Sequence, residues 1–346
     1  MANEGDWSNW TQIIGKYNKA SRAKSWWQLI NSIVPFFGLL VAMYYSLEVS
    51  YWLTLALSIP TAGFMVRIFI IFHDCGHGSF FASRRANVLV GRLCSLITMT
   101  PFANWSRQHN LHHADWNNLD RTGGGSDIYS ACLTVHQYLD RTPRERLVYR
   151  LSRHPLVANI LLPPLVFMLL YRLPFDTPRG WPRERRSVYL TNAALLLLFG
   201  TLVALLGWQQ VLLVHLPVMV VSSIVGVWLF TVQHRFATAH WTRKEQWNFV
   251  AAALSGASWL RLPRMLHWLT GNIGFHHIHH LNPRVPNYRL SAAHEAVQGV
   301  HPVDGLRVVD ALRAPRLTLW DEVSGRLVRF RDVKLPAAAG MSSKAG

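Results

Sequence analysis

Histidine is concentrated in three short motifs of this chain. They are His73–Asp74–Cys75–Gly76–His77, His109–Asn110–Leu111–His112–His113 and His276–His277–Ile278–His279–His280. Residues three or four positions apart share one face of a helix, so each motif can present two or three imidazoles together. Neutral imidazole is the commonest metal ligand in proteins. The three motifs therefore predict a metal site that is assembled from distant parts of the chain.

The number of imidazoles favours two metal ions over one. The histidines in the ligand register are His73, His77, His109, His112, His113, His276, His279 and His280. His277 is one residue off this register, and we expect it to point elsewhere. Nitrogen-rich ligation suits iron, copper or zinc. Zinc hydrolases usually place a carboxylate beside the metal, and the sequence has no H-E-x-x-H motif, so we favour iron acting with dioxygen.

Four apolar blocks must position these motifs. Each has about 20 residues, enough to cross a hydrocarbon core of roughly 30 Å. The blocks are residues 28–46, 51–72, 188–206 and 209–233. No cleavage site follows the first block, so we expect it to stay in the membrane. The predicted fold is an all-α integral membrane protein with four transmembrane helices in two hairpins, a cytoplasmic helical cap and interfacial helices.

Loop charges predict the orientation of these spans. The links 47–50 and 207–210 contain no Lys or Arg, whereas the other loops are basic, which places the two links outside and the histidine motifs in the cytoplasm. Motifs that share a site must be separated by an even number of crossings. Residues 88–103, interrupted by Arg92, are therefore expected to be interfacial or re-entrant, and residues 155–171, with a Pro-Pro pair, to lie on the cytoplasmic face.

The rest of the chain indicates one membrane domain. We expect a cytoplasmic segment at 1–27, the domain at 28–333 and a disordered tail at 334–346, which is rich in Pro, Ala, Gly and Ser. The net charge of +17 suits an anionic membrane surface. No nucleic-acid motif accompanies it, so no nucleic-acid partner is predicted. Three cysteines without paired spacing indicate reduced thiols.

The three motifs resemble those of the membrane-bound fatty acid desaturases. Residues 73–81 and 109–115 are similar to the first two histidine boxes of the acyl-lipid omega-6 (delta-12) type, and residues 270–290 resemble its third box with the residues C-terminal to it. The likeness covers roughly residues 55–295. It implies two iron ions held by histidine alone, four spans and a cytoplasmic cap. The implied reaction is the O2-dependent removal of two hydrogens from an acyl chain, which leaves a cis double bond.

The resemblance also implies a ninth ligand. The family uses a histidine at the cytoplasmic end of the last span, and His234 fits that place because the block 209–233 ends there. The alternative role for His234 is a charge–dipole interaction at a helix C-terminus. Some relatives hold a water through an asparagine one turn earlier, where this chain has Phe230.

Partners and competing activities are implied by the same resemblance. No haem domain is visible, so a separate electron donor is expected, such as a ferredoxin or a cytochrome b5 type protein. The acyl carrier remains open between glycerolipid, acyl-coenzyme A and acyl carrier protein. The same di-iron chemistry also serves hydroxylation, ketolation or triple-bond formation, and a more distant alternative is a non-enzymatic membrane metal-binding protein. The expected location is the bacterial inner membrane.

An acyl chain needs a long apolar tunnel. Aromatic residues of the second and fourth spans are candidate walls, with lipid contact or helix packing as the alternative: Phe69, Phe72, Trp228 and Phe230. Carboxylates near the motifs are candidates for orienting the imidazoles, with solvation or capping as the alternative: Asp74, Asp115, Asp120 and Asp127.

Overall fold

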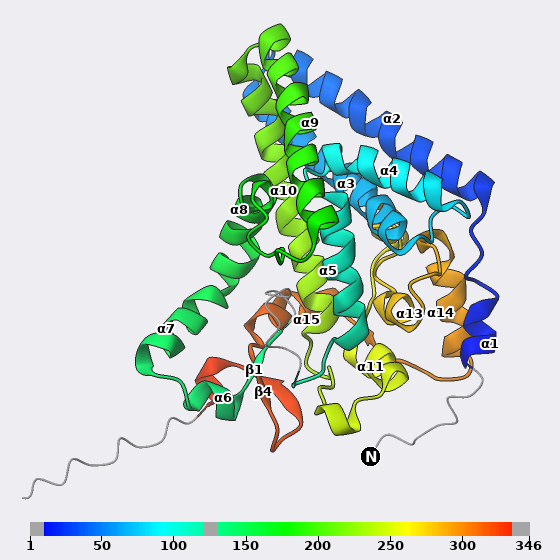
Figure 1. Ribbon diagram of the computed structural model, residues 1–346, viewed down its shortest axis with the longest axis vertical. Coiled ribbons are helices and arrows are strands. Elements are labelled where there is room, and N and C mark those ends of the chain that lie inside the picture. Colours follow the sequence, from blue (N-terminus) through cyan, green and yellow to red (C-terminus); the bar gives the residue numbers. More distant parts are fainter. Residues whose placement is uncertain (1–9, 121–130, 334–346) are drawn as a thin grey trace, which may run out of the picture.

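Long helices occupy one end of the molecule and short elements the other (Figure 1). The computed structural model describes residues 10–120 and 131–333. The predicted disordered tail, Asp127 and the first nine residues of the predicted cytoplasmic segment lie outside these ranges.

Within residues 10–120 and 131–333, four helices are long and apolar enough to cross a membrane, as the sequence predicts. They are α2 (Arg22–Ser46), α3 (Tyr51–His77), α9 (Pro182–Leu206) and α10 (Trp208–His234). Together with the short helices they confirm an all-α membrane fold. Three of the helices are clearly longer than the apolar blocks: α3 continues five residues further, through His77, and α2 and α9 each begin six residues earlier. The apolar pattern stops where polar residues begin, but a helix continues until its backbone is capped.

The caps explain where these helices begin and end. The Ser21 side chain accepts a hydrogen bond from the backbone N–H of Lys24 at the start of α2. Gly78 ends α3 in the left-handed conformation (φ +71°), which costs glycine little. This cap falls directly after His77, so it fixes the last helical turn that carries both histidines of the first motif. Gly207 (φ +87°) alone separates α9 from α10.

Two further helical segments are bent and lie where the sequence predicts interfacial or re-entrant structure. Helices α4 (Arg84–Ile97) and α5 (Phe102–Asp115) meet at 105°. Helix α7 (Pro143–Ser152) meets the segment Val157–Arg172 at 49°. That segment consists of a π-helical turn η2 (Val157–Leu161), α8 (Leu162–Met168) and a 3-10 turn η3 (Leu170–Arg172).

Short elements build the cap below the long helices (Figure 1). Its helices are α1 (Trp10–Gly15), α6 (Val135–Leu139), α11 (Phe249–Gly256), α12 (Arg264–Leu269), α13 (His276–Leu281), α14 (Leu290–Gln298) and α15 (Val308–Arg313). Its 3-10 turns are η4 (Lys244–Gln246), η5 (Asn287–Arg289), η6 (Ala314–Arg316) and η7 (Phe330–Asp332).

Five very short strands complete the described part of the cap. Strand β1 (Leu133–Thr134) pairs in parallel with β4 (Leu319–Asp321), which pairs antiparallel with β5 (Arg326–Val328). Strand β2 (Trp259–Leu260) pairs in parallel with β3 (Gly305–Leu306). These pairings tie the C-terminal part of the cap to segments that precede and follow the last two spans.

Two hydrophobic cores hold the histidine-bearing elements. The first joins α2, α3, α4 and α10 around residues such as Phe36, Ile68 and Phe72. The second lies in the cap, where α1, α11, α13 and α14 enclose Ile278 and Leu290. Helix α3 contributes to both cores, so it forms a rigid connection between the spans and the cap.

Candidate metal centre

The nine predicted ligands come from four helices that meet where the spans join the cap. Helix α3 brings His73 and His77 in its last turns. Helix α5 carries the second motif, α13 carries the third, and α10 ends at His234. The structure brings all nine imidazoles together in two adjoining clusters.

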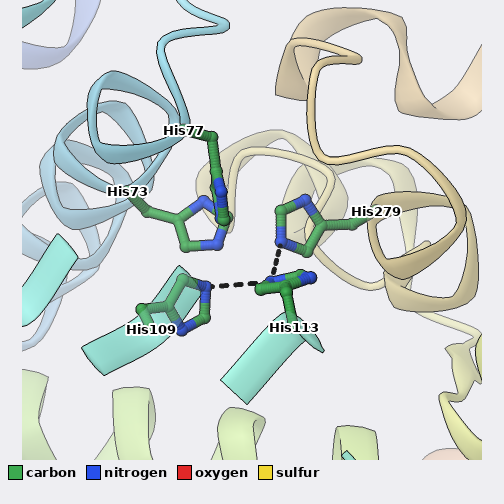
Figure 2. A group of neighbouring side chains, drawn as sticks. All are labelled: His73, His77, His109, His113 and His279. Carbon is green, nitrogen blue, oxygen red and sulfur yellow. Dashed lines mark hydrogen bonds between the residues drawn. The ribbon is translucent and has the colours of Figure 1, made fainter. Parts of the chain in front are cut away.

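The first cluster contains His73, His77, His109, His113 and His279. One nitrogen from each ring lies within 4.8 Å of the corresponding nitrogen of every other. His113 Nε2 is 3.1 Å from His109 Nε2 and 3.0 Å from His279 Nε2. Figure 2 shows these five rings turned toward a common centre from α3, α5 and α13.

The second cluster contains His112, His234, His276 and His280. His234 Nε2 lies 2.9 Å from His112 Nε2, 2.9 Å from His280 Nε2 and 3.2 Å from His276 Nε2. The rings of His113 and His280 are stacked 4.1 Å apart, so the two clusters touch. Helices α5 and α13 each contribute to both clusters.

Outer hydrogen bonds hold several of the rings in place. His73 Nδ1 lies 3.2 Å from Asp74 Oδ1, His77 Nδ1 lies 3.0 Å from Asn110 Oδ1, and His234 Nδ1 lies 2.8 Å from the carbonyl oxygen of Phe230. A ring that donates through Nδ1 keeps Nε2 free to bind metal. Asn110 has no chemical signal in the sequence beyond its place inside the second motif.

Burial keeps five of the imidazoles outside the spans neutral. It lowers the pKa of His109, His113, His276, His279 and His280 well below the ordinary value of 6.5, and neighbouring imidazoles lower each pKa further. A neutral imidazole has a lone pair for metal, whereas a protonated one has none.

Stability should therefore depend on pH with a definite sign. Because the folded-state pKa values lie below the unfolded value, the unfolded state binds more protons once the pH falls below 6.5. The stabilisation from neutral burial is complete above that pH and is lost as the pH falls toward the lowered values. The melting temperature of the detergent-solubilised, metal-free protein should fall from about pH 7 to about pH 5. A constant melting temperature across this range would contradict the burial of neutral rings.

The donor set fits metal ions. Adjacent nitrogen ligands about 2.1 Å from a metal lie about 3 Å apart, close to the spacing of the ring nitrogens here. His77 Nε2 is buried and has no hydrogen-bond partner among residues 10–120 and 131–333. A buried nitrogen without a partner is costly unless something binds it. Neither cluster includes a carboxylate from the described residues.

Other histidines lie outside the clusters. His277 is buried with Nε2 3.0 Å from His294 Nδ1, and burial, assisted by His294, lowers the pKa of His277 to about 3. Its ring points away from the site, as its off-register position predicts. His267 stacks on Phe275, and exposed His136 pairs with Asp140. Asp120 binds Arg243, away from the imidazoles.

An apolar cavity of about 190 Å³ reaches the clusters from between the spans. His73, His109, His112 and His276 line it at the metal end. Phe69 and Phe230, two of the predicted walls, also line it, together with Trp105, which stacks on His109 at 4.4 Å. The other two candidates take their alternative role, because Phe72 is fully buried among α3, α4 and α5 and Trp228 packs against the Leu260 cluster.

Comparisons with known proteins agree with this geometry. A model of the fatty acid desaturase family matches residues 50–310. A fatty acid desaturase of Bacillus subtilis (strain 168) is 43% identical over 324 residues, covering 94% of this chain and 91% of the relative. The sn-1 oleoyl-lipid 12-desaturase of Anabaena variabilis is 27% identical over 294 residues, covering 80% and 77%.

The region matched by the family model contains all nine clustered histidines. Residues 50–310 include the three motifs, His234 and both of the spans that line the cavity. The chain therefore belongs to the fatty acid desaturase family.

Proposed function

We propose that this enzyme inserts a cis double bond into a fatty acyl chain, using O2 and two iron ions held by nine histidines. The supporting observation is that two clusters of imidazoles, eight of the nine buried, adjoin an apolar cavity. The proposed ligands are His73, His77, His109, His113 and His279 for one ion, and His112, His234, His276 and His280 for the other. When bound, the two irons would supply the O2 activation that cleavage of an unactivated C–H bond requires.

The residues of the chain position the reaction. The cavity walls at Phe69, Trp105 and Phe230 hold methylenes beside the clusters and exclude water. Asp74 and Asn110 fix the orientation of two imidazoles from outside. The protein thus contributes geometry, a dry environment and imidazole ligands.

The proposed substrate is the acyl chain of a membrane glycerolipid. The cavity lies between spans α3 and α10, where an acyl chain of a bilayer lipid is close at hand. The name of the Anabaena relative specifies an oleoyl lipid. Acyl-coenzyme A and acyl carrier protein are the alternative carriers.

A separate protein must supply electrons. Two relatives, from Helianthus annuus and Synechocystis, carry ferredoxin in their names. The net charge of +17 favours an acidic donor of ferredoxin or cytochrome b5 type, because opposite charges steer association.

Expression in a host that lacks desaturases tests the function. Gas chromatography of the host lipids should show a new cis double bond, which should be absent from cells expressing the His280→Ala variant. A hydroxylated, ketonic or acetylenic acid would instead support the corresponding oxidation by the same centre. A lipid profile unchanged in the presence of a reducing partner would contradict the proposal.

The proposed orientation places the histidine clusters in the cytoplasm of a bacterial inner membrane. The three native cysteines are buried, so an introduced cysteine can be labelled selectively. A membrane-impermeant thiol reagent should label Val49→Cys and Gln209→Cys in intact cells, because these residues are exposed in the two links that contain no Lys or Arg. Arg141→Cys, exposed in the basic cap, should react only after permeabilisation. The reverse labelling pattern would refute the orientation.

A further inference from the structure

The apolar cavity has one exposed end and one buried end. Phe175, which is 57% exposed, lies at the first, and Met65 and Met219, each 5% exposed, lie at the second. The Ser222 hydroxyl lies 3.0 Å from Met65 Sδ, which joins α10 to α3 near the buried end. On α3, Met65 lies two turns and Phe69 one turn before His73, so the methionines line the part of the cavity that is farther from the cap than the histidines. An acyl chain that passes the clusters must therefore extend toward the two methionines.

Helix α10 forms one wall of this passage. Ser222, Gly226 and Phe230 line the cavity at intervals of four residues, and His234 lies one turn later. Such residues lie on one face of the helix. Gly226 is thus two turns from a metal-site histidine, about 12 Å along the helix axis, and about 10 Å from Met219.

Neither backbone conformation nor close packing explains why residue 226 is a glycine. It lies inside α10, where glycine costs about 1 kcal/mol relative to alanine. Its φ is not positive, so no turn requires it. Apart from its two chain neighbours and the backbone of its own helix, a Cβ added there would meet no atom of the described residues within 4 Å. By contrast, a Cβ at Gly63 of α3 would lie 2.7 Å from Leu269 Cδ2, so close packing explains that glycine.

We propose that Gly226 determines how far the acyl chain extends beyond the metal centre, and so which methylenes are oxidised. A polar head group cannot enter the buried apolar end without losing its hydration, so the methyl end enters first. The missing side chain at 226 leaves the last part of the passage open. A larger side chain would stop the methyl end nearer the clusters. This inference rests on the proposed desaturase function.

Enlarging residue 226 should change the position of the double bond. In Gly226→Leu, the new bond should form closer to the methyl end than in the wild type, and the native isomer should fall by about 10- to 200-fold, since a single misplaced methylene has an effect of that size. Gly226→Ala should shift the product distribution partially. The matched control is Gly200→Leu, an open glycine on the exposed surface of α9, which should give wild-type products.

A binding measurement keeps the test independent of catalysis. The melting temperature of purified protein in detergent is recorded with phosphatidylcholines of increasing acyl length. Wild type should be stabilised most by long chains and Gly226→Leu by shorter ones. Identical product isomers and identical length dependence in both proteins would overturn the inference. If the wild type forms no double bond, the proposed function fails, and the length dependence alone decides the role of Gly226.

Discussion

Replacing His280 with alanine is expected to abolish activity while the protein still inserts into the membrane. Its Nε2 lies 2.9 Å from His234 Nε2 and 3.0 Å from His276 Nε2, and its ring stacks on His113 of the other cluster. Loss of a residue that merely orients a ligand costs 10- to 100-fold, so loss of a ligand should cost more than about 100-fold. His77→Ala and His112→Ala should behave alike. Lipid analysis and iron content per chain measure both consequences.

The neighbouring residue offers a matched control. His277 is equally buried, but its ring contacts His294 and not the clusters. His277→Gln can keep a hydrogen bond to His294, so it should keep bound iron and most activity. If any two of the three alanine variants retained full activity, or if His277→Gln lost iron as His280→Ala does, the shared centre would be refuted.

Replacing Asp74 with asparagine should have the next greatest effect, because this buried carboxylate links three elements. Its Oδ1 lies 3.2 Å from His73 Nδ1, and its Oδ2 accepts hydrogen bonds from the backbone and side-chain nitrogens of Asn287 at 2.7 and 2.9 Å. Gln28 of α2 in turn donates to Asn287 Oδ1 at 2.8 Å. The carboxylate thereby connects a span, the cap and a metal-site imidazole.

Asparagine has the same shape as aspartate, but its NH2 group cannot accept a hydrogen bond. That group must face either the His73 ring nitrogen or the two Asn287 nitrogens. We expect activity and iron affinity to fall 10- to 100-fold, the usual cost of losing an outer partner. Stability should fall by about 1–3 kcal/mol because a buried donor is left unpaired. The control is Asp120→Asn at the exposed pair with Arg243, which should leave iron content unchanged. Equal effects of the two substitutions would show that Asp74 has no special role at His73.

The sequence predicts the candidate ligands but not how they divide between two clusters. In α5, His109 and His113 join one cluster and His112 the other, whereas in α13, His276 and His280 share a cluster and His279 belongs to its neighbour. Spacing places all three residues of a motif on one broad helix face. Which imidazole meets which depends on the placement of α3, α10 and α13 around α5, which is a property of the tertiary fold.

The strands of the cap and the walls of the cavity also depend on the tertiary fold and cannot be predicted from the sequence alone. The four spans are recognisable because about 20 apolar residues in a row have few alternatives, whereas the two- and three-residue strands of the cap leave no periodic pattern to detect. Phe69 and Phe72 are both aromatic and both in α3, yet only Phe69 lines the cavity. Their different directions around the helix become informative only once the partners of α3 are known.

The iron content of the purified protein tests the metal centre most directly. Protein purified from membranes in mild detergent, active and quantified by amino-acid analysis, should contain two iron ions per chain, and the His280→Ala variant should contain fewer. Active protein that contains no iron would contradict the proposal that these nine histidines hold the catalytic metal.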